Sequence, residues 1–327
     1  IRYQRGPGKA VGMKIAVFAY QDIGYECLKF LIETDEKIVA VVTHEDDPNE
    51  EIWFRSVADL AREYRLPVYT PASPNIESFI NLMRNHSPDL IFSFYYRRLL
   101  SKELLSISPM GGINLHGSLL PKYRGRCPVN WVLINGESET GVTLHDMVEK
   151  ADAGDILAQK RVTIDLDDTA FSLARKITSA GVQLLKETWP MIKSGSVRKI
   201  HQDSVLARTF GGRRPEDGEV HWNQSAMAIY NLIRAVTHPY PGAFTHYDGR
   251  KIYLWSARLD PSGGDLNGVD PGTIEAVVEQ GGLLVITGLG RLILRKAQVE
   301  GGTEISASEL LSGQGVTLGS RFGKRSL

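Results

Sequence analysis

Two polar side chains interrupt an apolar run near the middle of the chain, and their residue types suit group-transfer chemistry. Asn114 and His116 stand two positions apart within the sequence GINLHGSLLP. On an extended strand this spacing places both side chains on the same face. There, an amide can donate a hydrogen bond to a developing oxyanion while an imidazole moves protons. Gly117 follows directly and, lacking a side chain, would let a ligand approach the backbone closely.

A carboxylate further along the chain could complete this pair. Asp152 lies in an Ala-Asp-Ala-Gly segment that ends at Gly154. A carboxylate that reaches an imidazole raises the pKa of that imidazole. However, a turn aspartate before a glycine and a lone histidine beside an apolar strand are also common structural features. From spacing alone, a catalytic triad of Asn114, His116 and Asp152 and a purely structural interpretation are equally well supported.

Other residues capable of chemistry leave more alternatives open. Arg124 and Arg126 could bind a carboxylate or phosphate by bidentate hydrogen bonds, although turn arginines are often only solvated. The aromatic residues 94–96 could line a pocket for a flat ring, or could simply be buried at a strand end. No G-x-G-x-x-G pattern follows the first expected strand, so nicotinamide binding has no support. The run of residues 44–47 is more typical of a solvated loop than of ligands, and we expect no metal.

The elements that must position these residues alternate between strands and helices. Apolar runs typical of buried parallel strands occur at residues 14–20, 38–43, 90–94 and 113–115, with helical periodicity between them. This order predicts an α/β fold with a Rossmann-like, mostly parallel sheet covered by helices. Ligands of such sheets bind beyond the carboxyl ends of the strands, where residues 114–117 are expected to lie.

A change in composition divides the chain. Residues 194–217 form a connector rich in glycine, arginine and polar residues. After it, one helical segment and several short, glycine-punctuated strands predict a small C-terminal β-barrel of the OB-like type. We therefore predict a catalytic domain over residues 13–204 and a barrel domain over residues 205–320. Residues 1–12 lack hydrophobic periodicity and are interpreted as a tag remnant or a disordered extension.

The composition narrows the classes of partner. The 327 residues include 38 Lys and Arg and 38 Asp and Glu, so the formal net charge is zero. This balance gives no electrostatic case for nucleic acid or for an acidic membrane surface. No apolar run approaches the roughly 18 residues of a membrane span. Cys27 and Cys127 form neither a metal pattern nor a disulfide framework, which favours a cytoplasmic location. Homo-oligomerisation is left open.

A combination of motifs around the site resembles that of a known enzyme family. Residues 13 to about 320 resemble the enzymes that transfer a formyl group from 10-formyltetrahydrofolate to an amine. The resemblance rests on Asn114 to Pro121, Tyr123 to Gly125 and Ala151 to Gly154, which are specific in combination but not singly. That family also has a small C-terminal barrel.

This resemblance implies roles for individual residues. His116 would be the acid/base, Asn114 the transition-state stabiliser, and Asp152 the group that tunes His116. Folate contacts would come from two loops and one arginine. The implied contact residues are Arg98, Leu99, Leu100, Arg126, Val148, Glu149, Lys150, Ala151 and Asp152.

Within the family, the chain is most similar to the formyltransferase domains of the bifunctional polymyxin-resistance enzymes. Those domains act on UDP-4-amino-4-deoxy-L-arabinose in the lipid A modification of lipopolysaccharide. The supporting segments are Phe92–Arg97, His116–Arg126, Asn130–Leu133, Glu139–His145 and Pro239–Phe244. The second, dehydrogenase domain of those enzymes has no counterpart in this sequence. The predicted function is therefore N-formyl transfer to the amine of a nucleotide-linked 4-amino sugar.

Several alternatives stay open. The nucleotide could be dTDP instead of UDP. The sister activity formylates methionyl-tRNA and contacts the tRNA through a basic insertion after the second strand. Here that position is the acidic loop Thr43–Glu51, which would repel phosphates. Hydrolysis of 10-formyltetrahydrofolate, and folate binding without catalysis, are the remaining alternatives.

Overall fold

The computed structural model describes residues 12–34, 36–48, 51–262, 268–313 and 315–323. The extension expected at residues 1–12 lies outside these residues, apart from Gly12. Within them, the chain folds into two compact units that alternate along the sequence. The first contains the chain up to Arg124, residues 141–162 and residues 177–209, and the second contains residues 125–140, 163–176 and those from Phe210 onward. The predicted domain division at residue 205 stays a prediction.

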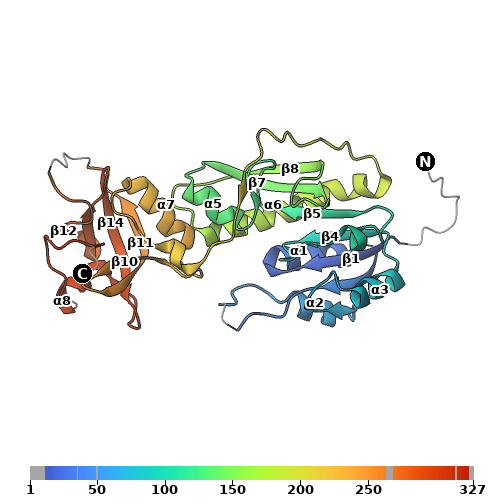
Figure 1. The fold of residues 1–327 in the computed structure, drawn as a ribbon, viewed down its shortest axis with the longest axis horizontal. Coiled ribbons are helices and arrows are strands. Elements are labelled where there is room, and N and C mark those ends of the chain that lie inside the picture. Colours follow the sequence, from blue (N-terminus) through green and yellow to red (C-terminus); the bar gives the residue numbers. More distant parts are fainter. Residues whose placement is uncertain (1–11, 35, 49–50, 263–267, 314, 324–327) are drawn as a thin grey trace. The chain divides into compact units, whose positions relative to one another are not determined.

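A mostly parallel sheet is the centre of the first unit (Figure 1). In the described residues it has seven strands in the order β3-β2-β1-β4-β5-β7-β8. The elements from the first strand to the eighth are β1 (Lys14–Ala19), α1 (Gln21–Ile32), β2 (Lys37–Val42), α2 (Val57–Glu63), β3 (Val68–Tyr69), α3 (Glu77–His86), β4 (Leu90–Phe94), α4 (Lys102–Leu105), β5 (Gly112–His116), β6 (Arg124–Gly125), α5 (Pro128–Ile134), β7 (Glu139–Asp146) and β8 (Ile156–Thr163).

The parallel strands coincide with the apolar runs of the sequence. The pairings of β1 with β2, β1 with β4, and β4 with β5 are all parallel. Their residues are almost wholly buried because helices cover both faces of the sheet. β7 instead runs antiparallel to β5. The predicted α/β class with a mostly parallel, Rossmann-like sheet is confirmed.

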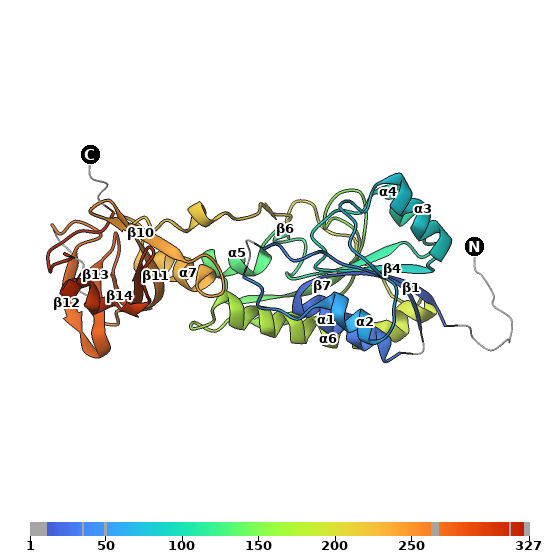
Figure 2. The ribbon, with the colours of Figure 1, turned by 90° about the horizontal axis from the view of Figure 1, so that it is seen from below.

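Helices form a layer on each side of this sheet. Figure 2 shows α3 and α4 on one face, and α1, α2 and the long helix α6 (Ala170–Ser194) on the other. On the α6 face, the ring of Phe92 lies 5.8 Å from that of Trp189, measured between centroids. The side chain of Leu115 points to the same face, because a Cβ built on Gly181 of α6 would lie 2.9 Å from Cδ2 of Leu115. Side chains that alternate with Leu115 along β5 therefore point to the α3/α4 face.

The second unit contains an antiparallel sheet. Its strand order is β10-β11-β14-β13-β12, with β15 paired to β14, in the part of the chain that is described. The remaining elements are β9 (Thr209–Phe210), α7 (Ala226–Val236), β10 (Ala243–Tyr247), β11 (Arg250–Leu259), β12 (Ile274–Val278), β13 (Gly282–Ile286), β14 (Arg291–Val299), β15 (Ile305–Ser306) and α8 (Leu310–Gly313), with short 3-10 turns at Pro215–Gly218, Glu279–Gly281 and Ala307–Glu309.

A C-terminal segment joins the two outer strands of this sheet. The Phe322 amide donates to the Gly272 carbonyl (2.9 Å), just before β12, and the Gly323 amide donates to the His246 carbonyl of β10 (2.8 Å). This double pairing connects the edges of the sheet as in a barrel, in agreement with the predicted small β domain. No helix among the described residues is long and apolar enough to cross a membrane.

Candidate active site

β5 and β7 place four polar side chains on one face of the sheet. Asn114 lies opposite His145 across the antiparallel pair, and His116 lies opposite Thr143. β5 extends to His116, so Asn114 lies inside the strand and not beyond its end. Because β7 is antiparallel, the loop that follows it starts beside the first residue of β5, where the Met147 amide donates to the Gly112 carbonyl (2.7 Å). From there, residues 147–155 return toward His116.

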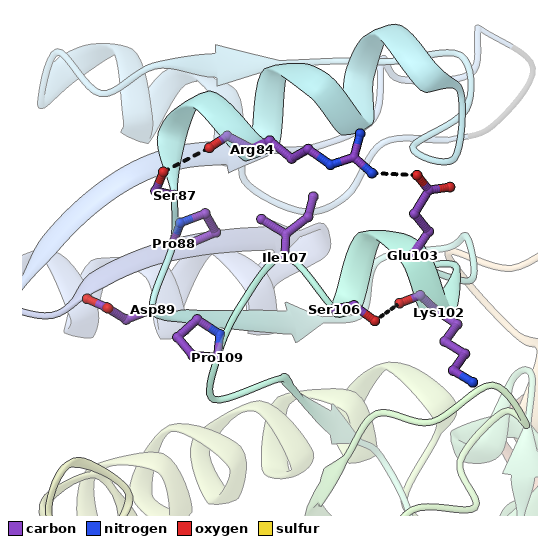
Figure 3. A pocket seen from close by; sticks show the side chains of 9 residues that line it. All are labelled: Arg84, Ser87, Pro88, Asp89, Lys102, Glu103, Ser106, Ile107 and Pro109. Carbon is purple, nitrogen blue, oxygen red and sulfur yellow. Dashed lines mark hydrogen bonds and ion pairs between the residues drawn. The ribbon is translucent and has the colours of Figure 1, made fainter. Parts of the chain in front are cut away.

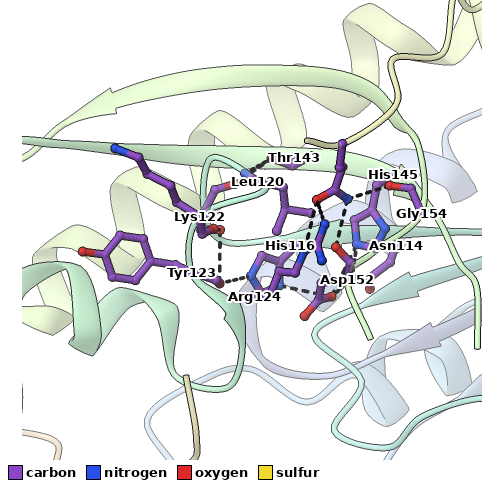
Figure 4. Close-up of polar contacts among 12 residues, drawn as sticks. Asn114, His116, Leu120, Lys122, Tyr123, Arg124, Thr143, His145, Asp152 and Gly154 are labelled. Carbon is purple, nitrogen blue, oxygen red and sulfur yellow. Dashed lines mark hydrogen bonds and ion pairs between the residues drawn. The ribbon is translucent and has the colours of Figure 1, made fainter. Parts of the chain in front are cut away.

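This returning loop brings Asp152 to the two residues predicted from the sequence, as Figure 4 shows. One carboxylate oxygen, Oδ1, lies 3.6 Å from Nδ1 of His116 and 3.5 Å from Nδ2 of Asn114. It also lies 3.5 Å from Nε2 of His145. These separations are longer than ordinary hydrogen bonds. The structure therefore brings Asn114, His116 and Asp152 together and adds a second histidine.

The two nitrogens of His116 have different surroundings. Nε2 lies 2.7 Å from the backbone carbonyl oxygen of Tyr123. A carbonyl can only accept, so Nε2 carries a proton and Nδ1 is the basic nitrogen of the neutral ring. Burial lowers the pKa of His116 below its ordinary value, more than the opposing effects of Asp152 and the Tyr123 carbonyl raise it; His145 also lowers it. His116 is therefore neutral at neutral pH, with its free lone pair facing Asp152.

His145 fixes the orientation of the Asn114 amide. Its Nδ1 lies 2.8 Å from the Asp146 carbonyl oxygen and must donate to it, which leaves Nε2 as an acceptor. The Nδ2 of Asn114 lies 3.0 Å from that Nε2 and donates one hydrogen to it. The second hydrogen of the same amide faces the more distant Asp152 oxygen. One N–H is thus held firmly by His145, whereas the other makes only a long contact of 3.5 Å with Asp152.

A network of hydrogen bonds holds the loop that supplies the Tyr123 carbonyl. Thr143 donates through its hydroxyl to the Ser118 carbonyl (2.6 Å) and accepts from the Leu120 amide (3.1 Å). Gln159 donates to the Leu120 carbonyl (2.8 Å). The backbone of the segment Ser118–Pro121 is thus hydrogen-bonded to side chains of β7 and β8. This explains why the segment follows His116 directly.

Gly117 is required for a reason different from the predicted one. A Cβ at this position would overlap the hydroxyl oxygen of Tyr95. The space beside the Gly117 backbone is therefore filled by a side chain of the protein, and not left for a ligand. The expectation that this glycine admits a ligand is wrong.

The residues implied as folate contacts fall into three places. Arg98, Leu99 and Leu100 follow β4, where Leu100 is buried and Leu99 is 66% exposed. The side chain of Asn75 fixes this loop, since it donates to the Leu99 carbonyl (2.9 Å) and accepts from the Ser101 amide (2.8 Å).

The second group of implied contacts, Val148 to Asp152, is the loop that carries the catalytic carboxylate. Val148 at its start is 46% exposed. Arg126 is exposed and belongs to the second unit. All these contacts stay predictions.

Two hollows of the surface lie away from the catalytic cluster. One, of about 850 Å³, is bordered by the end of α3, by α4 and by the loops that precede β4 and β5, and the ion pair of Arg84 with Glu103 lies at it (Figure 3). The other, of about 330 Å³, lies at the ends of β1 and β2 and includes Tyr20 and His44. Neither is lined by Asn114, His116 or Asp152.

The motifs did not reveal every residue of the cluster. His145 lies in a segment that supports the family resemblance, but its contact with Asn114 follows only from the antiparallel register. The Tyr123 carbonyl has no side-chain signature at all. Gln202 reaches the Asp152 loop from a segment after α6 that carries no recognisable motif. Only the folded chain shows these contacts.

Two family models match the chain. The model described as formyl transferase matches residues 13–188, and the model described as formyl transferase, C-terminal domain, matches residues 213–315. The first covers more than half of the chain and includes Asn114, His116 and Asp152.

Solved structures resemble the chain in fold. An N-formyltransferase from Helicobacter canadensis, in complex with folinic acid and dTDP-3-aminofucose, has a TM-score of 0.67 and 20% identity, covering 86% of this chain and 98% of its own. WlaRD, a sugar 3N-formyl transferase in the presence of dTDP and 5-N-formyl-THF, has a TM-score of 0.65 and 20% identity over 89% and 99%. A methionyl-tRNA formyltransferase from Clostridium thermocellum has a TM-score of 0.54 and 18% identity over 76% and 95%.

Proposed function

The chain belongs to the formyl transferase family, and we propose that it moves a formyl group from 10-formyltetrahydrofolate to the amine of a nucleotide-linked amino sugar. The observation that carries this proposal is the cluster of Asn114, His116 and Asp152 on one sheet face. In it, a directed amide N–H and a basic imidazole nitrogen converge on a single carboxylate oxygen. This is the set of groups that an acyl transfer to nitrogen requires.

The proposed reaction forms one bond and breaks one. The amine nitrogen of the acceptor attacks the formyl carbon, and the bond from that carbon to the folate nitrogen then breaks. Nδ1 of His116 takes the proton released by the amine and returns it to the departing folate nitrogen. Atoms and charge therefore balance without a further reactant.

The protein stabilises the charges that appear on the way. The N–H of Asn114 that points toward Asp152 donates instead to the oxygen of the formyl group as that oxygen gains negative charge. When His116 is protonated, its Nδ1–H faces the Asp152 carboxylate while Nε2–H still donates to the Tyr123 carbonyl. The side chains of His116 and Asp152 are only 8% and 12% exposed, so little water weakens this pairing.

The folate donor fits two exposed apolar residues among the implied contacts. The flat, partly polar pterin ring needs apolar contacts together with backbone donors and acceptors. Leu99 and Val148 are large apolar side chains exposed on loops, and both belong to the implied folate contacts. This placement supports 10-formyltetrahydrofolate as the co-substrate.

The candidate acceptors are UDP-linked amino sugars, dTDP-linked amino sugars and methionyl-tRNA. For the amino sugar, motif similarity favours UDP-4-amino-4-deoxy-L-arabinose, and hence the lipid A modification linked to polymyxin resistance. A dTDP-linked amino sugar fits as well, because the two sugar formyltransferases of similar fold are described with dTDP-3-aminofucose and with dTDP. Against methionyl-tRNA stands the loop after β2, where Glu45, Asp46 and Asp47 are exposed. Cytoplasmic location, oligomeric state and absence of metal stay predictions.

A panel of acceptors tests the proposal. Tetrahydrofolate formation is measured with 10-formyltetrahydrofolate and each of several UDP- and dTDP-linked 3- and 4-amino sugars, with methionyl-tRNA as the negative control. We expect turnover with at least one amino sugar and none with the tRNA. Formate release without any amine would instead indicate a hydrolase. Donor binding without turnover of any amine would indicate a non-catalytic folate-binding protein.

A further inference from the structure

A buried glutamine far from the motifs holds the backbone of the catalytic loop. Gln202, in the segment after α6, is only 3% exposed. Its Nε2 donates to the carbonyl oxygen of Asp152 (2.9 Å) and to that of Gly154 (2.6 Å). Both hydrogens of the amide are therefore used on the loop that carries the catalytic carboxylate.

A buried arginine fixes which way this amide points. Arg124 donates to Oε1 of Gln202 through Nε (3.1 Å) and through Nη2 (2.7 Å). A guanidinium can only donate hydrogen bonds, so the amide of Gln202 must turn its oxygen, Oε1, toward Arg124. Nε2 of Gln202 must then face the loop. Arg124 is itself 5% exposed and directly follows Tyr123, whose carbonyl binds His116.

The loop needs such support because its backbone is strained. Asp152 has a φ of 53°, in the left-handed region that residues other than glycine seldom adopt. A conformation of this kind persists only where the surroundings hold it. Gly154 is also constrained, since a Cβ there would overlap the Asp146 carbonyl oxygen.

We propose that Gln202, oriented by Arg124, is a positioning residue that holds Asp152 at its working distance from Nδ1 of His116. The two loops of the site are thereby coupled, because Arg124 belongs to the loop that binds Nε2 of His116 and Gln202 binds the loop that faces Nδ1. Gln202 touches no reacting atom. Its contribution to turnover rests on the proposed function, whereas its effect on His116 does not.

The titration of His116 in the full-length protein measures this coupling directly. With labelled histidine, nuclear magnetic resonance follows the eight histidines of the chain, and His116→Gln identifies the signal of His116. The titratable groups facing His116 are Asp152, which raises its pKa, and His145, which lowers it. When Gln202→Ala lets Asp152 move away, the pKa of His116 falls, in the same direction as in Asp152→Asn.

Two further variants separate positioning from folding. Gln202→Glu keeps an oxygen for Arg124 but cannot donate to the two carbonyls, and its charge is paired with the Arg124 guanidinium. It should therefore lower the pKa of His116 as Gln202→Ala does. Gln183→Ala is the matched control, because Gln183 is exposed on α6, where it donates to Glu187 (2.8 Å). Gln183→Ala should leave the titration unchanged.

The turnover number should fall in the same variants in which the pKa of His116 falls. Both Gln202 variants should lower kcat about 10- to 100-fold, the scale of an ångström-sized displacement of a catalytic group. Melting curves show which variants fold, and Gln202→Glu decides the question if Gln202→Ala does not. A folded Gln202→Glu protein whose His116 titrates as in the wild type would overturn the proposal. Altered titration without formyl transfer to any amine would leave it standing and count against the proposed function alone.

Discussion

Nε2 of His116 lies 2.7 Å from the carbonyl oxygen of Tyr123, and this contact determines which nitrogen of the ring can act as a base. The carbonyl holds a proton on Nε2, so only Nδ1 can take one up. Nδ1 is also the nitrogen that faces Asp152, at 3.6 Å. A backbone oxygen with no recognisable motif thus sets the direction of proton transfer.

Asp152→Asn should shift the acidic limb of the pH–rate profile to lower pH. His116 must be neutral to accept a proton, so activity falls as the pH drops through its pKa. Burial already places this pKa below the ordinary value of about 6.5, and Asp152 opposes the effect of burial. Removing the carboxylate's charge therefore lowers the pKa further. Asparagine tolerates the left-handed backbone of this position. The profile of kcat against pH checks this, and an unmoved limb would exclude Asp152 from tuning His116.

His145→Phe should reduce kcat by less than about 10²-fold, chiefly through Asn114. Phenylalanine cannot accept the Asn114 hydrogen that His145 accepts at 3.0 Å, so the amide loses its fixed orientation. Removing one oxyanion donor outright costs about 10²–10³-fold. The double variant Asn114→Ala/His145→Phe should be no slower than Asn114→Ala alone. If the two losses multiply, His145 acts independently of Asn114. His145→Gln, which retains an acceptor, should recover part of the rate.

Gly117→Ala should destabilise the protein and lower its activity, and Tyr95→Phe should reverse much of both effects. The added methyl group overlaps the Tyr95 hydroxyl oxygen, while the ring carbon that bears this oxygen is 3.0 Å away. Overpacking of this kind costs about 1–3 kcal/mol. Chemical unfolding of the two single variants and the double variant measures the coupling. Additive free energies would show that the overlap is relieved elsewhere.

The sequence predicted the elements of the first unit because buried parallel strands leave a clear apolar signal. The run at residues 90–94 is the strand Leu90–Phe94, and the pair Asn114 and His116 shares one face as the spacing required. The antiparallel direction of β7 has no such signal. The direction of β7 depends on the path of the preceding chain. Without it, the pairing of Asn114 with His145 could not be predicted.

The supporting contacts were beyond prediction for a related reason. Gln202 acts on the backbone of Asp152, and Tyr123 acts through its own carbonyl, so neither side chain type indicates the role. The role of Gly117 was misjudged because its constraint comes from Tyr95, a residue on another strand end. Contacts made through backbone atoms between distant segments need the folded structure.

His44 should make the protein less stable between about pH 6.5 and pH 4. Burial, followed by the nearby Arg98 and Arg97, lowers its pKa to about 4. The unfolded chain, with a histidine pKa of about 6.5, binds this proton more readily. Stability is therefore lost as the pH falls through this window, by about 2 kcal/mol after allowance for solvent screening.

Urea unfolding at several pH values checks the His44 prediction. His44→Gln removes the titrating group, so its free energy of unfolding should fall less steeply between pH 6.5 and 4. His221→Gln, at an exposed histidine of the second unit, is the matched control and should follow the wild type. Equal slopes for wild type and His44→Gln would exclude a contribution from His44.

The central claim is that His116 moves the proton during formyl transfer to an amine. The most direct measurement is the rate of 10-formyltetrahydrofolate-dependent formylation of an accepted amino sugar by wild type and His116→Ala, under saturating substrates. A positioned acid/base contributes about 10²–10⁴-fold, so a folded His116→Ala protein should lose that factor in kcat. A folded His116→Ala protein that formylates the same amine at the wild-type rate would contradict the account.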